Sequence, residues 1–122
     1  MDKALHDAGL QVRKEIMDTE RIDKVMANVT DFDKPFQDMV NEYCWGAIWT
    51  RPGLSRKVRS LINIAMLTAL NRPNEVKLHV EGAIKNGCTE EEIREVLLQT
   101  VVYCGVPAGL ESFKIAKEVL KK

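Results

Sequence analysis

The chain has 122 residues, of which 45% are apolar and 30% are charged, a profile typical of one globular domain. Eighteen basic residues balance eighteen acidic ones, so no overall field attracts nucleic acid or an anionic membrane. The first residues lack the apolar run of a secretory signal, and no segment reaches the roughly 20 apolar residues that span a bilayer. We therefore expect one cytoplasmic domain over residues 1–122, with no nucleic-acid or membrane partner.

The cysteines and histidines argue against a disulfide framework and against a metal centre. Cys44, Cys88 and Cys104 are odd in number and far apart, without a C-x-x-C pair, which is typical of reduced thiols in a cytosolic protein. His6 and His79 are also far apart and show no usual metal-ligand spacing. A glycine-rich phosphate loop is absent as well. We expect no metal and no cofactor.

Apolar residues in the first half recur every three or four positions, which predicts helices rather than strands. The pattern indicates a helix over residues 4–16 and one or two helical turns around residues 22–26. The next helix is expected to begin at Asp31 or Asp33 and to run to about Trp49. A Pro-Gly pair at residues 52–53 ends it.

The second half begins with a helix over residues 58–70 that has almost no polar face, so we expect it to form the buried centre of the domain. A helix over residues 75–86 should stop at Gly87, and residues 89–92 form a capping box for a helix that ends at Cys104. Residues 105–107 make a corner before a last amphipathic helix. The chain is predicted to be a compact all-α domain of six or seven helices, and its surplus of apolar surface predicts a homo-oligomer.

Both tryptophans lie close to a Pro-Gly turn that is flanked by arginines. Trp45, Trp49 and Arg51 precede the turn, and Arg59 follows it. Aromatic walls beside guanidinium groups suit a small anionic ligand, because the planar arginine fork donates two parallel hydrogen bonds to a carboxylate. Taken singly, each arginine also fits a surface charge or a structural ion pair, and Tyr43 and Trp45 also fit core aromatic residues.

His79 lies in the middle of a predicted helix, on the same face as Arg72 and Glu75. One interpretation is a core histidine satisfied by a neighbouring hydrogen bond. The other is a general acid, because the pKa of imidazole lies near neutrality. The residue pattern leaves both open. His6 lies in a charged helix and is expected to be a solvated surface residue.

Several segments together resemble the carboxymuconolactone decarboxylases. The most specific are W-T-R-P-G-L at residues 49–54 and Y-C-G-V-P at residues 103–107. Further similarity covers nearly the whole chain, over residues 31–37, 45–61, 78–87 and 92–99. The resemblance implies an all-α fold of the alkylhydroperoxidase-like superfamily, whose members assemble as trimers or hexamers.

The peroxidase branch of that superfamily carries a C-x-x-C-x-x-x-H motif. When its histidine is placed on His79, the two cysteines fall on Arg72 and Glu75, and neither residue can form a thiolate or a disulfide. The sequence therefore favours the decarboxylase branch and leaves peroxidase activity absent or doubtful.

The resemblance implies cofactor-independent decarboxylation of 4-carboxymuconolactone to the 3-oxoadipate enol-lactone, in aromatic catabolism. In our hypothesis His79 donates the proton, Arg51 anchors a carboxylate, and Arg59 or Arg72 stabilises the oxyanion. The other expected substrate-binding residues are Trp45 and Trp49 as a wall, with Glu75, Tyr103 and Cys104. Three alternatives stay open: another carboxylated lactone or β-keto acid as substrate, an inactive oligomeric scaffold, and a thiol-dependent reductase that uses Cys44 or Cys104.

Overall fold

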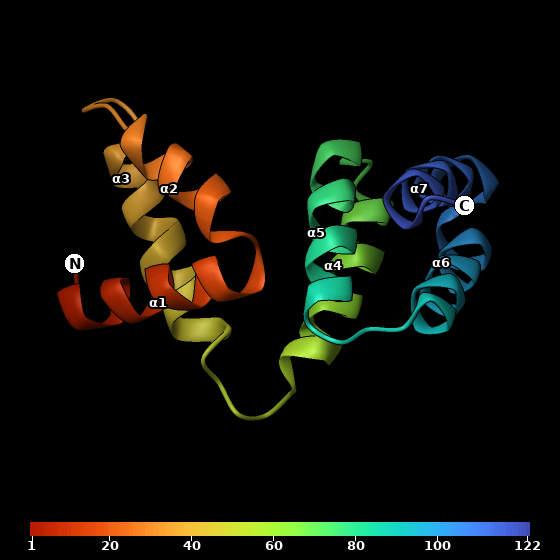
Figure 1. Cartoon of the computed structure of the whole chain (residues 1–122), viewed down its shortest axis with the longest axis horizontal. Helices are drawn as coiled ribbons and strands as arrows, with labels where there is room; N and C mark the ends of the chain where they lie inside the picture. The colour runs from red at the N-terminus through yellow and green to blue at the C-terminus, as the bar shows by residue number, and fades with distance from the viewer. The chain divides into compact units, whose positions relative to one another are not determined.

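The computed structural model describes residues 1–122 and is entirely helical (Figure 1). Seven α-helices and one π-helical segment, η1, follow one another without a strand: α1 (Lys3–Ile16), α2 (Thr19–Ala27), α3 (Lys34–Met39), η1 (Val40–Ile48), α4 (Arg56–Ala69), α5 (Pro73–Lys85), α6 (Glu90–Cys104) and α7 (Val106–Leu120). The predicted all-α class and the predicted number of helices are confirmed. No helix combines the length and the apolar character that a membrane span requires.

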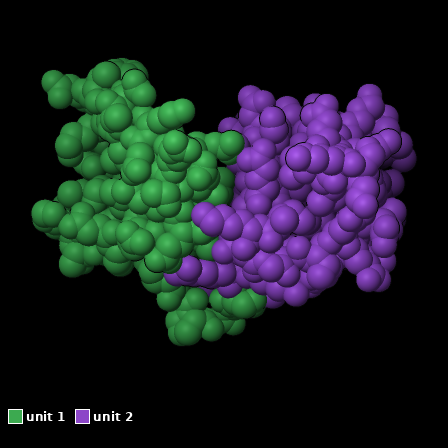
Figure 2. All heavy atoms as spheres, in the orientation of Figure 1, with its two compact units in different colours: residues 1–55 green, residues 56–122 purple.

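The chain divides into two compact units, which Figure 2 colours separately. Unit 1 contains residues Met1–Ser55, and unit 2 contains residues Arg56–Lys122. Each unit has its own cluster of buried apolar side chains. The prediction that residues 1–122 form a single domain stays a prediction, and the two units are described in turn.

Unit 1 is built on a close crossing of α1 and η1. A Cβ atom added at Gly9 would overlap the carbonyl oxygen of Asn41 and lie 2.6 Å from the amide nitrogen of Gly46. A Cβ atom added at Gly46 would in turn lie 2.5 Å from the carbonyl oxygen of Leu5. Only glycine at both positions lets the two backbones approach this closely. The crossing is flanked by the core cluster of unit 1, formed by Val12, Ile16, Trp45 and Trp49.

The predicted helix from residue 33 to about residue 49 is present, but its second half is wound more widely than an α-helix. The amide of Trp49 donates to the carbonyl oxygen of Cys44, five residues earlier, over 3.2 Å. Asp33 stands at the N-cap position, but its carboxylate accepts hydrogen bonds from the amide (2.7 Å) and the hydroxyl (3.2 Å) of Thr30. It therefore orders the preceding turn and does not cap the helix amides.

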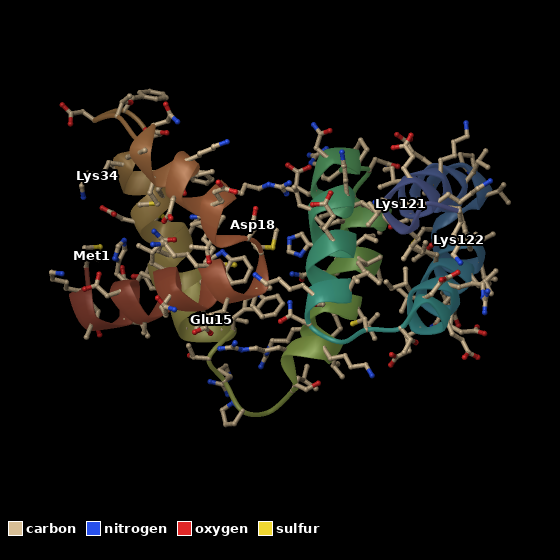
Figure 3. The ribbon with its side chains drawn as sticks, in the orientation of Figure 1. Met1, Glu15, Asp18, Lys34, Lys121 and Lys122 are labelled. Atoms are coloured by element: carbon tan, nitrogen blue, oxygen red, sulfur yellow. The ribbon has the colours of Figure 1, made fainter.

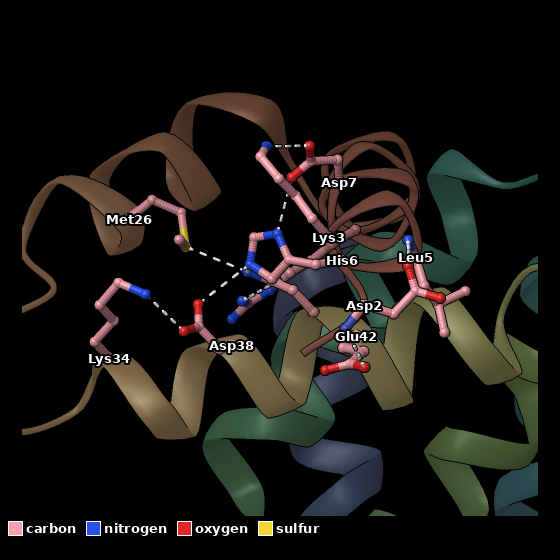
Figure 4. Close-up of polar contacts among 11 residues, drawn as sticks. Asp2, Lys3, Leu5, His6, Asp7, Met26, Lys34, Asp38 and Glu42 are labelled. Atoms are coloured by element: carbon pink, nitrogen blue, oxygen red, sulfur yellow. Dashed lines mark hydrogen bonds and ion pairs between the residues drawn. The ribbon is translucent and has the colours of Figure 1, made fainter.

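The expectation that His6 is a solvated surface residue was wrong. Its side chain is only 12% exposed, because α3 and η1 cover this face of α1 (Figure 4). The imidazole Nδ1 lies 3.0 Å from Asp7 Oδ1, and Nε2 lies 3.3 Å from Asp38 Oδ1 and 3.3 Å from Asn41 Nδ2. Asn41 is fully buried and also accepts from Arg13 Nη1 over 3.0 Å. This polar network ties α1 to α3 and η1.

Unit 2 packs α4, α5, α6 and α7 around one apolar cluster. Its most deeply buried side chains are between 0 and 1% exposed: Ile64, Val76, Val80, Ala83, Ile93 and Leu97. Lys122 follows the end of α7 (Figure 3), and its Nζ lies 3.6 Å from Glu90 Oε2 at the start of α6. This ion pair links the start of α6 to the residues that follow α7, at the edge of the core.

The predicted helix boundaries in unit 2 are confirmed where local chemistry sets them. Thr89 and Glu92 form the capping box, with the Glu92 amide donating to Thr89 Oγ1 over 3.0 Å and the Thr89 amide donating to Glu92 Oε1 over 2.9 Å. Gly87 has φ 91°, and the following Cys88 amide donates to the carbonyl oxygen of Ala83 over 2.9 Å, which ends α5. Gly105, with φ 102°, turns the chain from α6 into α7.

The expectation that the 58–70 helix is the buried centre was wrong in part. Only Ser60, Ile64 and Thr68 of α4 are buried, and they form a single stripe. Leu61, Ala65 and Leu67 are partly buried, whereas four large apolar residues of this segment are between 38 and 62% exposed: Val58, Ile62, Met66 and, just after the helix, Leu70. Too few elements surround α4 within one chain to cover every face, so much of its apolar surface is left open.

We predict that Gly9→Ala lowers the free energy of unfolding of unit 1 by about 1–3 kcal/mol, because the added methyl group overlaps the η1 backbone and forces the helices apart. Urea unfolding followed by tryptophan fluorescence measures the change. Gly53→Ala is the matched control, since a Cβ atom there meets nothing within 4 Å. Equal stabilities for the two variants would contradict the role given to the crossing.

Candidate functional site

His79 is the titratable residue of unit 2 in the most unusual surroundings. It lies in the middle of α5 and is half-buried. Burial lowers its pKa below the usual 6.5, and the negative charge of Glu75, one helical turn earlier, opposes this shift without cancelling it. The imidazole Nδ1 lies 3.5 Å from the amide nitrogen of Asn63 on α4. His79 is therefore held mostly neutral at neutral pH and is in contact with a polar side chain.

Asn63 was not singled out from the sequence. It stands between Ile62 and Ile64 and is the one polar residue in the apolar run over residues 61–67. An amide side chain inside an apolar run is the one sequence signal that could have pointed to Asn63 as a site residue. Without the register of α4 against α5, nothing in the sequence tells which residue it faces.

Two expected arginines of the site also belong to unit 2. Arg59 precedes Asn63 by one turn on the same face of α4. Arg72 occupies the N-cap position of α5, where it is exposed and precedes Glu75 by three residues. Five residues therefore lie on the α4–α5 pair: Arg59, Asn63, Arg72, Glu75 and His79. Of the two arginines, Arg59 lies in the first turn of α4 and Arg72 lies just before α5.

Tyr103 and Cys104 lie at the end of α6 and are both exposed. They line an open, mainly apolar cavity of about 310 Å³ between α4 and α6. The apolar walls of the cavity come from Val58, Leu61, Ile62, Ala65 and Val96, with Gln99 and Thr100 as polar members. His79 does not line this cavity, so within unit 2 the expected site residues fall into two groups, one around His79 and one around Tyr103.

Trp45, Trp49 and Arg51 belong to unit 1. The two indole rings stack with centroids 4.9 Å apart and planes at 27°, and each tryptophan is 5% exposed. They pack in the core of unit 1. Arg51 is exposed just after η1, and its amide donates to the carbonyl oxygen of Ile48 over 3.0 Å. A shared site that contains these three residues together with His79 stays a prediction.

Two of the three cysteines, Cys44 and Cys88, are poorly suited to thiolate chemistry. Burial raises the pKa of the Cys44 thiol, and the nearby positive charge of Arg13 only partly offsets this. Burial also raises the pKa of Cys88, which lies in the core of unit 2 with its Sγ donating to the carbonyl oxygen of Lys57 over 3.5 Å. Attack on a peroxide or a disulfide requires the thiolate, so these environments oppose it at Cys44 and Cys88.

No three histidine, cysteine, aspartate or glutamate side chains gather in a way that could hold a metal ion. The α4–α5 pair offers an imidazole, an amide and guanidinium groups, which can donate hydrogen bonds, carry positive charge and transfer a proton. That the reaction needs no cofactor stays a prediction.

Comparison with known proteins assigns the family. Residues 34–118 match the carboxymuconolactone decarboxylase family, and the chain belongs to it. The chain is 37% identical over 120 residues to the 4-carboxymuconolactone decarboxylase of Acinetobacter baylyi, covering 98% of this chain and 90% of that protein. It is 38% identical over 120 residues to the nitrosuccinic acid decarboxylase npaB of Metarhizium robertsii, covering 98% and 84%. Both of these relatives are named as decarboxylases.

We predict that burial of His79 makes folding sensitive to mild acid. The unfolded chain takes up a proton near the usual pKa of 6.5, whereas the folded chain does so only at lower pH. Between these two pKa values the unfolded state binds more protons, so the free energy of unfolding falls as the pH falls below about 6.5 and is unaffected by His79 above it. Urea unfolding at a series of pH values should show a weaker dependence in His79→Gln. An unchanged dependence would contradict the burial of this imidazole.

Proposed function

We propose that this protein is a carboxy-lyase that converts 4-carboxymuconolactone to the 3-oxoadipate enol-lactone and CO2 without a cofactor. The observation that carries the proposal is the nearly full-length similarity to the decarboxylase of Acinetobacter baylyi, within a family to which the chain belongs. A cytoplasmic location and a role in the breakdown of aromatic acids are part of the same proposal.

The chemistry defines what the site must supply. The substrate is an unsaturated lactone with one carboxylate on the ring and one on an acetate arm. When the ring carboxylate leaves as CO2, its bonding electrons delocalise through the ring double bond onto the lactone carbonyl oxygen. A donor must stabilise that oxygen, worth about 3–4 kcal/mol, and an acid must protonate the distant ring carbon, worth about 10²–10⁴-fold.

His79 is the proposed acid. Because burial lowers its pKa, the imidazolium form is a minor population at neutral pH, and proton delivery should become faster as the solution becomes more acidic. Arg59 or Arg72, at the two ends of α4, is the proposed partner of the oxyanion. Arg51 is the proposed anchor of the acetate carboxylate, with Trp45 and Trp49 as the wall of the site.

We also propose that the enzyme works as a homo-oligomer, a trimer or a hexamer. The support is apolar surface that a single chain leaves open on three helices of unit 2. It includes Ile62 and Met66 of α4, Leu98, Val102 and Tyr103 of α6, and Val106 and Leu110 of α7, all between 38 and 81% exposed. Apolar surface on this scale is typical of a subunit interface.

A second candidate substrate is a nitro-substituted dicarboxylic acid. It is favoured by the similarity to the nitrosuccinic acid decarboxylase, which is of the same extent as the similarity to the lactone decarboxylase. Both named substrates carry two carboxylates and an electron-accepting group whose oxygen takes up charge when CO2 leaves. Donors placed for an enolate oxygen also suit a nitronate oxygen, so one arrangement of residues fits either compound.

The decisive test is turnover in D2O. The purified protein is mixed with 4-carboxymuconolactone, and the products are followed by NMR. We expect loss of one CO2 for each substrate and one deuterium on the product ring. Absence of turnover by a folded protein would reject the lactone, and nitrosuccinic acid would then be assayed in the same way.

We predict that His79→Gln lowers kcat by about 10²–10⁴-fold while the fold is retained, because the proton donor is lost. Steady-state kinetics measures the change, and circular dichroism checks the fold. His6→Gln is the matched control, since His6 belongs to the polar network of unit 1 and is given no part in the reaction. Near-normal activity of His79→Gln would remove histidine from the mechanism.

We predict that Val102→Asp breaks the assembly into monomers, because it places a charge at a residue that is 78% exposed on the apolar face. Light scattering coupled to size-exclusion chromatography gives the mass in solution. Val102→Ala keeps the face uncharged and should remain oligomeric. A wild-type mass equal to that of a single chain, 13.8 kDa, would contradict the proposed oligomer.

A further inference from the structure

Asn63 occupies a position that its own helix does not explain. It is partly buried in the apolar run of α4, where an amide gains nothing from apolar neighbours. Its Nδ2 lies 3.5 Å from Nδ1 of His79 on α5. This contact connects two helices that are otherwise joined by apolar packing around Ile64, Val76 and Val80.

The direction of this contact selects one form of the imidazole. An amide nitrogen only donates hydrogen bonds, so the ring nitrogen that it faces must accept. Neutral imidazole carries a single N–H, and when Nδ1 accepts, that hydrogen is on Nε2. The Nε2–H edge is then the part of His79 that is not engaged by Asn63.

We propose that Asn63 is a positioning residue that holds Nδ1 of His79 and thereby makes Nε2 the nitrogen that exchanges a proton with the ligand. The inference rests on the proposed function for the identity of that ligand. The tautomer of His79 and its contact with Asn63 are properties of the free protein and do not depend on which ligand binds.

An amide can serve both protonation states of the ring, because it can either donate to Nδ1 or accept from Nδ1–H. When solvent protonates Nδ1, the amide turns over and its oxygen accepts from the new Nδ1–H. The imidazolium then gives its Nε2 proton to the substrate carbon and is left neutral, with its hydrogen on Nδ1. Proton exchange with solvent then returns the ring to the Nε2–H form, and the amide turns back so that its nitrogen again faces Nδ1. A carboxylate could only accept, and would hold the hydrogen on Nδ1 throughout.

The charges on the two helices flank this pair. Glu75 lies one turn before His79 on α5 and favours the imidazolium, and Arg59 lies one turn before Asn63 on α4. Neither explains the choice between Nδ1 and Nε2, which requires a group directly against one nitrogen. Asn63 is that group.

The test is ¹⁵N NMR of the full chain labelled at histidine, titrated with acid. We expect neutral His79 of the wild type to carry its hydrogen on Nε2. In Asn63→Asp the hydrogen should move to Nδ1, and the ratio of imidazolium to neutral imidazole at a given pH should rise by about tenfold or more, since a carboxylate within about 4–6 Å shifts a pKa by one unit or more. The signals of His6, in unit 1, should not change.

Asn74→Asp is the matched control, because it adds the same charge to the exposed first turn of α5, away from Nδ1. It should leave the tautomer unchanged and shift the titration far less than Asn63→Asp. A wild-type His79 with its hydrogen on Nδ1 would overturn the proposal, and so would an Asn63→Asp protein that titrates like Asn74→Asp. The wild-type spectrum gives the first of these results even if a variant fails to fold.

Turnover separates this inference from the proposed function. If the lactone is a substrate, Asn63→Leu should lower kcat by about tenfold or more with little change in KM, and Asn74→Asp should leave both unchanged. If the wild type shows the Nε2–H tautomer but does not turn over the lactone, the substrate is wrong and the role of Asn63 stands. Full activity of a folded Asn63→Leu would overturn that role.

Discussion

The packing of α4 against α5 is the constraint on which the candidate site depends. Ile64, Val76 and Val80 are between 0 and 1% exposed, and they interlock the two helices. Only residues 70–72 separate the helices, so the chain must reverse direction and the pair is antiparallel. Side chains interdigitate in few registers, and the observed register brings His79 against Asn63. A slip of one turn in either direction would separate the half-buried imidazole from this amide.

The same helix shows how one element can serve several purposes. The buried stripe of α4 fills the core, and the face next to it carries Asn63 toward His79. A third face, with Val58 and Ile62, lines the open apolar cavity beside α6. Because each of these faces of α4 makes its own contacts, few substitutions in this helix would leave all of them unchanged. The apolar residues of α4 therefore exceed what the core of unit 2 requires, and only three of its fourteen residues are buried.

Features set by neighbours in the sequence could be predicted, and those set by distant contacts could not. The capping box at Thr89 and the stop at Gly87 involve residues three to five apart, so the local sequence contains all of their chemistry. The burial of His6 depends on α3 and η1 lying over α1, and no periodicity within α1 reveals that. The close crossing of η1 with α1 at Gly9 likewise joins segments that are distant in sequence.

For the candidate site, the residue types could be predicted but not their partners. The pattern identified His79 and the nearby arginines, because an imidazole and guanidinium groups are rare in an apolar setting. It missed Asn63, because an amide has no distinctive signal until its neighbour is known. The grouping of Tyr103 and Cys104 around a separate cavity also required the packing of α4 against α6, which sequence spacing does not give.

The placement of the tryptophans has a consequence for any spectroscopic study of this protein. Both indoles lie in unit 1 and are stacked on each other, and unit 2 contains none. Tryptophan fluorescence, excited apart from Tyr43 and Tyr103, therefore arises in unit 1 alone, while far-ultraviolet circular dichroism records the helices of both units. Superimposable curves from the two probes would show that the units unfold as one cooperative block, and separated curves would reveal a species in which one unit remains folded without the other.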